Sequence, residues 1–151
     1  MSNTQAMCTS FKGELLTGTH NFGTGVVRAS TAADTFKAAL YLDSATINAS
    51  TTAYTASGEV SGTGYTAGGV TVTFGTAPST SGTTAFVTPS ASITYSSVTL
   101  STAFDCVLIY NSSQSDKAVS VHTFGSQTVT AGTFTLTMPV NDASTGLIRL
   151  A

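Results

Sequence analysis

Tryptophan is absent from this chain, and charged residues make up only 8% of its 151 residues, where soluble proteins usually carry about 25%. The basic residues do not cluster; they are Lys12, Arg28, Lys37, Lys117 and Arg149. Because phosphate binding needs a basic patch or stripe, direct nucleic-acid binding is disfavoured. So few charges indicate a surface that is either covered by a partner or kept soluble by weakly polar strands, and we favour the partner.

Long apolar runs and metal-ligand patterns are also missing. No apolar run approaches about 18 residues, so no membrane partner is expected. Residues 1–5 have neither a basic nor an apolar leader character. We therefore expect a protein that is made and kept in the cytoplasm, or that leaves it only as part of a particle. His20, His122, Cys8 and Cys106 contain no close ligand pair, which argues against a metal site.

Strong catalytic groupings are missing too. His122, Asp105 and a serine could be combined into a triad on paper, but nothing resembles a nucleophile elbow and hydroxyl residues are too numerous to be informative. We expect no enzyme, and we expect His122 to face outward from an alternating strand. For Cys8 and Cys106, two buried free thiols are favoured, with a disulfide as the alternative.

One stretch matches a cofactor motif by its letters alone. Residues 62–67, GTGYTA, fit the G-x-G-x-x-A dinucleotide pattern. That pattern works only between a strand and a helix whose N-terminus holds pyrophosphate, and here an alternating β run follows. We interpret the stretch as a glycine-rich turn, and no cofactor is expected.

The patterns that are present predict a mainly β protein. A chain of this length forms one domain, residues 1–151, with enough surface to bury a core. Short alternating or apolar segments, separated by turn residues, predict strands at 35–42, 70–74, 84–87, 93–100, 104–110, 118–124, 127–130, 133–139 and 147–150. The most apolar, 104–110, should be central and form a hairpin with 118–124. The fold class is an antiparallel β-sandwich, jelly-roll-like or immunoglobulin-like, with residues 75–82 as an exposed loop.

A short helix is predicted at the N-terminus, at about 4–17. Ser2 could cap it and Gly18 should end it. Its apolar stripe would consist of Cys8, Phe11 and Leu15. We expect the helix to pack on its own domain; the alternative is that it docks on a partner.

The stretch 54–74 is the organising element of the sequence. It has glycines and two tyrosines around the acid Glu59, followed by the alternating run 70–74. Glycine permits positive φ or close backbone approach, and tyrosine adds apolar bulk with a polar tip. Glu59 either accepts hydrogen bonds from loop amides or contacts a neighbouring subunit. The candidate residues of this turn or interface are Glu59, Gly62, Gly64, Tyr65, Gly68 and Gly69.

Asp105 stands inside the most apolar predicted strand. If it is buried, its carboxylate has to be hydrogen-bonded or paired, and Lys37 or Arg149 could be the partner. Such a group usually organises a fold and does not react. If that face of the strand is exposed to solvent, Asp105 has no special role.

Several of these segments together resemble a known group of proteins. They are FKGELLTG at 11–18, FKAALY at 36–41, YTASGEVSGTGYTAGG at 54–69, and the strand and polar turn that follow Ala103-Phe104-Asp105. In this order they resemble small virion structural proteins of tailed bacteriophages, over most of the chain. The order of the third segment is the most unusual part of the likeness. The motif carries no catalytic residue that could be transferred to this chain.

The resemblance implies a capsid cement or decoration protein on the virion surface. Such a protein would bind the major capsid protein where shell subunits meet and would form a dimer or trimer there. The helix, the Glu59 turn and the polar loops would be the contact elements. Two alternatives stay open: a tail, head–tail adaptor or fibre-base component, and a carbohydrate-binding module. The second is disfavoured because it needs exposed aromatic residues, and here the five tyrosines are spread along the chain.

Overall fold

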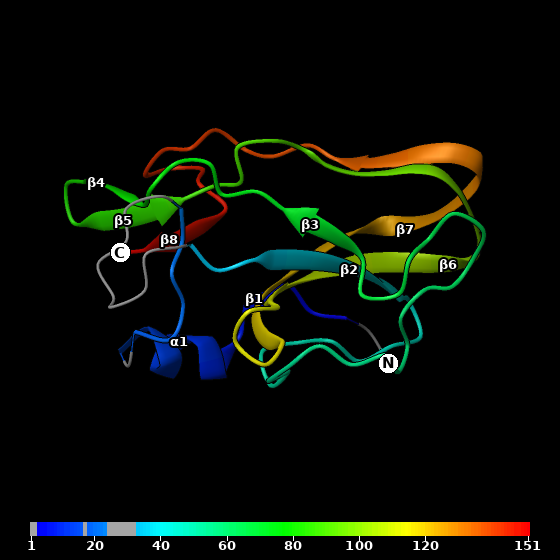
Figure 1. Cartoon of the computed structure of the whole chain (residues 1–151), viewed down its shortest axis with the longest axis horizontal. Helices are drawn as coiled ribbons and strands as arrows, with labels where there is room; N and C mark the ends of the chain where they lie inside the picture. Colours follow the sequence, from blue (N-terminus) through cyan, green and yellow to red (C-terminus); the bar gives the residue numbers. More distant parts are fainter. Residues whose placement is uncertain (1–2, 17, 24–32) are drawn as a thin grey trace.

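The computed structural model of the chain describes residues 3–16, 18–23 and 33–151. It is mainly β, with antiparallel strands in two sheets that give a sandwich-like arrangement, as predicted (Figure 1). The elements are β1 (Ala6–Met7), α1 (Thr9–Leu16), β2 (Phe36–Leu42), β3 (Val70–Val72), β4 (Ser79–Ser81), β5 (Thr84–Val87), β6 (Ile93–Asn111), β7 (Lys117–Leu136) and β8 (Ile148–Leu150). One sheet has the order β1-β7-β6-β2-β3, and the other has the order β4-β5-β8.

The β6–β7 hairpin builds most of the molecule. It pairs from Asn111 opposite Lys117 to Ile93 opposite Leu136, and its register shifts at several points along the way. Shifts of this kind bend a strand and increase its twist. The hairpin therefore curves over on itself, at the right end of Figure 1, and supplies a lower half next to β2 and an upper leaf above β3. We define the upper leaf as residues 93–100 of β6 and 128–136 of β7.

The core lies between the two halves of this hairpin. Phe104 of the lower half and Phe134 of the upper leaf meet edge to face, with ring centroids 5.1 Å apart. The buried Tyr95 hydroxyl of the upper leaf donates a hydrogen bond of 2.8 Å to the Ala38 carbonyl of β2. The aromatic contact and the hydrogen-bonded phenol thus join two layers, the upper leaf and the sheet formed by β2 with the lower half of the hairpin.

The opposite face of the lower half is covered by the excursion 43–69. Tyr110 donates to the Gly68 carbonyl at 2.8 Å and stacks on Tyr54, with ring centroids 4.9 Å apart. Tyr41 donates to the Thr55 carbonyl at 2.6 Å. Both faces of β2 and of residues 106–111 of β6 are therefore buried or nearly so, which explains why these segments read as nearly continuous apolar runs.

Most predicted strands are present, and two differences have a common cause. The predicted strands 93–100 and 104–110 join in β6, and 118–124, 127–130 and 133–139 join in β7, which ends at Leu136. They join because the backbone pairing of β6 with β7 runs through the polar residues at the bend. The predicted loop 75–82 is exposed but contains β4, which pairs with β5 across a turn at Gly82.

The N-terminal helix is shorter than the predicted span 4–17. Residues Ala6 and Met7 form β1 and pair with β7, and the Cys8 amide donates to the Val119 carbonyl at 3.1 Å. These sheet bonds hold the backbone extended, so the helix begins only at Thr9. Its end agrees with the prediction, because Gly18 takes a positive φ of 65° and its amide donates back to Leu15. Ser2, the predicted cap, lies outside the described residues.

The favoured expectation for the cysteines is confirmed. Cys8 and Cys106 are free and buried. Burial raises the pKa of the Cys8 thiol to about 11 and that of the Cys106 thiol to about 12. Both therefore stay protonated and unreactive at neutral pH.

We predict that Gly69→Ala lowers the free energy of unfolding by more than about 2 kcal/mol. Gly69 has φ +72°, and a β-carbon there would collide with the Ala38 carbonyl of β2. Gly82 has φ +59° but open space around it, so Gly82→Ala should cost only about 1 kcal/mol. Urea denaturation of the two variants measures the difference, and equal losses would show that the collision does not matter.

Candidate functional site

Glu59 is the centre of the glycine-rich turn. Its carboxylate accepts hydrogen bonds from the Tyr54 hydroxyl at 2.6 Å, the Tyr65 hydroxyl at 2.8 Å and the Gly68 amide at 2.7 Å. A carboxylate is an acceptor-only group, and these three donors match it. Glu59 thus accepts a hydrogen bond from a loop amide, one of the two roles that the sequence left open; contact with a neighbouring subunit stays a prediction.

Tyr65 links this carboxylate to the sheet. While its hydroxyl donates to Glu59, it accepts a hydrogen bond of 3.0 Å from the Leu40 amide of β2. The Leu40 carbonyl accepts from the Val60 amide, also at 3.0 Å. The strand β3 pairs only with residues 36–38 of β2. Further along the same edge, at Leu40, the backbone groups of β2 are hydrogen-bonded by the turn instead. Burial, followed by the bond to Glu59, raises the pKa of Tyr54 to about 12, so its phenol keeps its proton.

The predicted glycines of the turn serve backbone approach. A β-carbon on Gly62 would collide with the Thr99 carbonyl of β6, and one on Gly64 with the Ser97 carbonyl. Gly68 is buried. All six residues predicted for this turn, namely Glu59, Gly62, Gly64, Tyr65, Gly68 and Gly69, thus lie in one turn that packs along β2 and β6.

Asp105 is half-buried, not buried, at a point where the register of β6 shifts. Its carboxylate contacts the side-chain amide of Asn3. The Asn3 amide also donates to the Leu42 carbonyl at 3.0 Å, so Asp105 helps to hold the N-terminal segment on the sheet. The partners suggested from sequence differ from this: Arg149, for example, donates to the Ser144 carbonyl at 2.5 Å.

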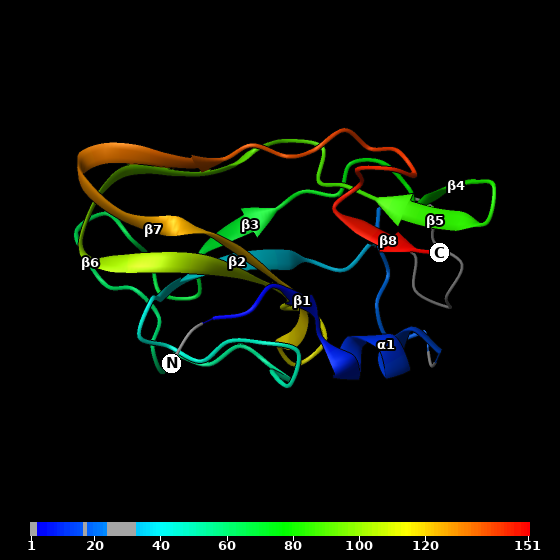
Figure 2. The same ribbon diagram turned by 180° about the vertical axis from the view of Figure 1, so that it is seen from behind.

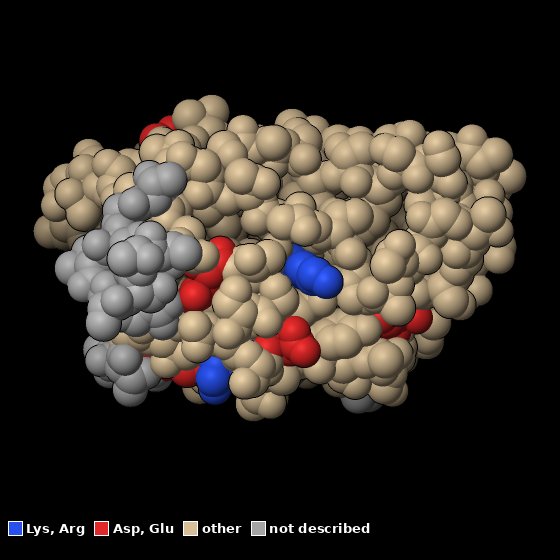
Figure 3. All heavy atoms as spheres, viewed as in Figure 1, with Lys and Arg blue, Asp and Glu red and all other residues tan. Residues whose placement is uncertain are grey.

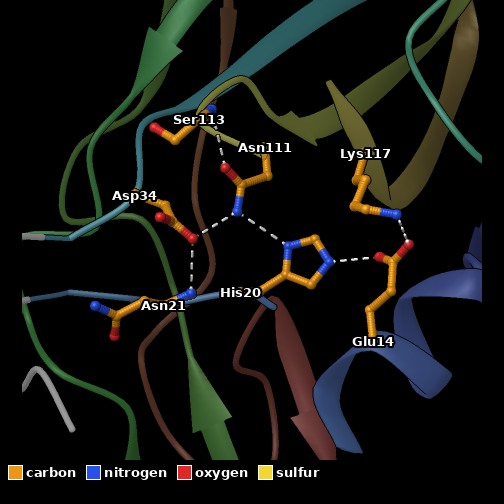
Figure 4. A network of polar contacts seen from close by, with 7 residues as sticks. All are labelled: Glu14, His20, Asn21, Asp34, Asn111, Ser113 and Lys117. Atoms are coloured by element: carbon orange, nitrogen blue, oxygen red, sulfur yellow. Dashed lines mark hydrogen bonds and ion pairs between the residues drawn. The ribbon is translucent and has the colours of Figure 1, made fainter. Parts of the chain in front are cut away.

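A second polar cluster joins α1 to the far ends of β2, β6 and β7 (Figure 4). The buried His20 ring contacts Glu14 through Nε2 at 2.6 Å and Asn111 through Nδ1 at 3.1 Å. The Asn111 amide also donates to Asp34 at 2.8 Å, and Lys117 donates to the other Glu14 oxygen at 2.7 Å. We call these five residues the His20 network.

The donors in the His20 network fix the state of the imidazole. The Ser113 amide donates to the Asn111 side-chain oxygen at 3.1 Å, which sets the orientation of that amide group. The Asn111 nitrogen, a donor only, therefore faces His20, and Nδ1 must accept. The proton lies on Nε2 and points to Glu14. Both ring nitrogens of His20 are thus occupied within the chain.

The charges of the network agree with this assignment. Burial lowers the pKa of His20, against the opposing effect of Glu14, so the ring is neutral near pH 7. Burial alone would raise the pKa of Glu14, but the hydrogen bonds from Lys117 and His20 overcome it and lower that pKa. The network thus combines a neutral imidazole with an ionised carboxylate and a lysine.

An apolar cleft of about 460 Å³ opens beside this network, between α1 and the β4-β5-β8 sheet. Its lining includes Phe11, Leu15, Phe22, Phe86, Ile148 and Leu150, together with His20 and Asn21. Concave apolar walls with few polar groups suit an apolar side chain or ligand better than a charged one. Leu150, at its rim, is 43% exposed.

His122 does not face outward as predicted. It lines a small apolar cavity of about 130 Å³ between the two layers, beside Val107 and Phe124. The bends in β7 change which side chains face inward, and alternation within one segment could not reveal this. His122 bonds Ser120 at 2.9 Å, and Asp105 contacts Asn3, so the structure does not join His122 to Asp105.

Comparisons with protein-family models, with curated proteins and with solved structures find no match for this chain. Within residues 3–16, 18–23 and 33–151, no three His, Cys, Asp or Glu side chains are grouped so that they could hold a metal ion. None of the helices in that part of the chain is long and apolar enough to span a bilayer.

Sequence reasoning missed the His20 network and the cleft. Glu14, His20, Asp34 and Asn111 share no motif in the sequence, and Asn111 is 91 residues from His20. No local pattern marks them as a group. The fold brings these residues together, so the network depends on tertiary structure.

We predict that Glu59→Gln lowers the free energy of unfolding by about 2–3 kcal/mol, because the glutamine amide would turn a donor toward groups that themselves donate. Asp43→Asn, at an exposed carboxylate, is the control and should change it by less than about 0.5 kcal/mol. Urea denaturation compares the two variants. A loss for Glu59→Gln no larger than that of the control would contradict the role of Glu59 as the centre of the turn.

We also predict that acid destabilises the protein through His122. Burial lowers its pKa from the ordinary value of about 6.5 to about 4. Between these values the unfolded chain binds a proton that the folded chain does not, so the free energy of unfolding falls as pH falls. The contribution at pH 5 is about 2 kcal/mol. Denaturation at pH 7 and pH 5 should show a smaller fall in His122→Gln than in the wild type; equal falls would refute it.

Proposed function

We propose that the chain is a structural virion protein of a tailed phage, a cement or decoration protein that binds the outer shell where major capsid proteins meet. The motifs at 11–18, 36–41 and 54–69 support it through their resemblance to small phage virion proteins. The mainly β sandwich-like fold is compatible with this role. Self-association on the shell, as a dimer or trimer, is part of the proposal.

The observation that carries the proposal is that the conspicuous polar groups are occupied from within the chain. Glu59 accepts three internal hydrogen bonds, and both nitrogens of His20 have internal partners. An acid, base or nucleophile has to present a free position to a substrate. These groups stabilise the fold, and this favours a function carried by the outer surface.

The surface supports a contact role. On the face that Figure 3 shows, the charged side chains lie mainly in the lower half of the view, and the upper part carries only a small acidic spot. Cores of protein interfaces are depleted in charge. The apolar lining of the cleft next to Leu150 favours an apolar side chain of the capsid protein over a charged ligand.

The tyrosines speak against the carbohydrate-binding alternative. Tyr41, Tyr95 and Tyr110 are buried, and Tyr54 and Tyr65 donate to Glu59. A sugar platform needs exposed aromatic faces, whereas three of these rings are buried and the other two are half-buried and hydrogen-bonded to Glu59. The capsid role and the tail role differ in copy number, which should be in the hundreds per virion for a cement protein and in the tens or fewer for a tail component.

We predict that phage particles lacking the protein release their DNA at a lower temperature than complete particles, because the contacts between capsid proteins lose their support. A thermal-release assay on purified particles measures this, and adding back the wild-type protein should restore the release temperature. Equal release temperatures with and without the protein would count against the proposal.

A matched pair of variants tests the contact surface. Leu150 at the cleft is 43% exposed, and Val140 elsewhere is 71% exposed. Because both are exposed, a glutamate at either position should leave the fold intact. Leu150→Glu should fail to bind or restore the particles, whereas Val140→Glu should succeed. Equal binding of both would remove the cleft from the contact.

A further inference from the structure

The upper leaf has two strands, and its two outer edges differ. The β6 edge is covered by the glycine turn: the Thr99 amide donates to the Thr63 carbonyl at 2.9 Å. Gly62 and Gly64 come so close to β6 that a β-carbon on either would collide with its backbone. At residues 97–100 this edge is therefore covered by the chain itself.

The β7 edge has no such cover. In the part of the chain that the structure describes, the only strand outside β7 is β1, which pairs at Val121 and Ser120 (Figure 2). Among the described residues, no strand pairs with the outer side of 124–136. The alternate backbone groups that point away from β6 are left without a strand partner.

The inward side chains differ in the same way. On β6, Ile93 and Tyr95 are each only 3% exposed. Their cross-strand neighbours on β7, Leu136 and Phe134, are only partly buried. The unpaired edge thus runs beside a row of incompletely covered apolar side chains.

The sequence of this edge lacks two of the usual safeguards, charge and proline. No charged residue occurs from 118 to 141, and no proline occurs there before Pro139. Natural proteins protect free edges with lysine, proline, bulges or short strands. Register shifts against β6 interrupt the part of the edge before Gly132, where Ala131 also has a positive φ of +44°. Residues 132–136 then form an uninterrupted edge.

We propose that a second copy of this chain pairs antiparallel along the β7 edge, centred on residues 132–136, and joins two upper leaves into one four-stranded sheet. Around a twofold axis, outward threonines would lie beside threonines, and Phe134 and Leu136 beside apolar side chains of the copy. Because the strand carries no charge, two copies of it do not repel each other. A charged partner would have no opposite charge to pair with on this strand. A two-stranded sheet is only marginally stable, whereas a sheet of three or more strands is stable. Pairing therefore also stabilises the upper leaf of each copy.

This inference names the surface for the self-contact in the proposed function, and it rests on that proposal only for its setting on a shell. The pairing is a property of the purified chain and can be tested without particles. A dimer together with particles that do not need the protein would refute only the shell role. A monomer that still stabilises particles would refute only the pairing.

Sedimentation equilibrium of the full chain tests the pairing. The double variant Thr133→Glu/Thr135→Glu places like charges on the β7 edge, and Thr94→Glu/Ser96→Glu places the same charges one strand inward; all four positions are exposed. The wild type and the β6 variant should have twice the mass of one chain. The β7 variant should dissociate about tenfold more readily or more. A monomeric wild type, or equal effects of both variants, would overturn the proposal.

Cysteine cross-linking gives an independent check. Because the native thiols are buried, a cysteine introduced at the surface is the accessible one. With residue 134 on the twofold axis, position 133 of one copy faces position 135 of the other. Under mild oxidation Thr133→Cys/Thr135→Cys should therefore form disulfide-linked dimers much faster than Thr94→Cys/Ser96→Cys. Equal rates would place the contact elsewhere and overturn the assignment of the edge.

Discussion

The pairing of β6 with β7 is the interaction on which the rest of the structure depends. Only this hairpin belongs to both layers: its lower half holds β1 and β2, and its upper leaf covers the core. Its register shifts allow the bend, and the bend sets Phe134 over Phe104. A straight hairpin of the same composition would have left one apolar face uncovered.

Pattern alone predicted the mainly β class, because the alternation along 70–74 and 133–136 and the apolar run 104–110 are local properties. It could not predict that neighbouring segments would join through a polar bend, because backbone hydrogen bonds ignore side-chain polarity. It also placed the helix start too early, since the sheet bonds of Ala6 and Met7 override the helical propensity of the segment.

The candidate site was predictable in part for a similar reason. Glu59 was noticeable in the sequence because an acid among glycines needs hydrogen-bond donors. One of its donors, the Gly68 amide, is only nine residues away. His20 and Asn111 are 91 residues apart, and only the fold brings them together. His122 was misplaced because the bends in β7 change the alternation on which the prediction relied.

The tyrosine arrangement also gives the protein its optical character. With no tryptophan in the chain, its five phenols are the dominant near-ultraviolet chromophores, and the hydroxyls of Tyr54 and Tyr65 both end on Glu59. Near-ultraviolet circular dichroism and tyrosine fluorescence therefore report on the edge of β2 and on the turn that closes it. These tyrosines are therefore intrinsic spectroscopic probes of the place where the excursion 43–69 packs against the sheet.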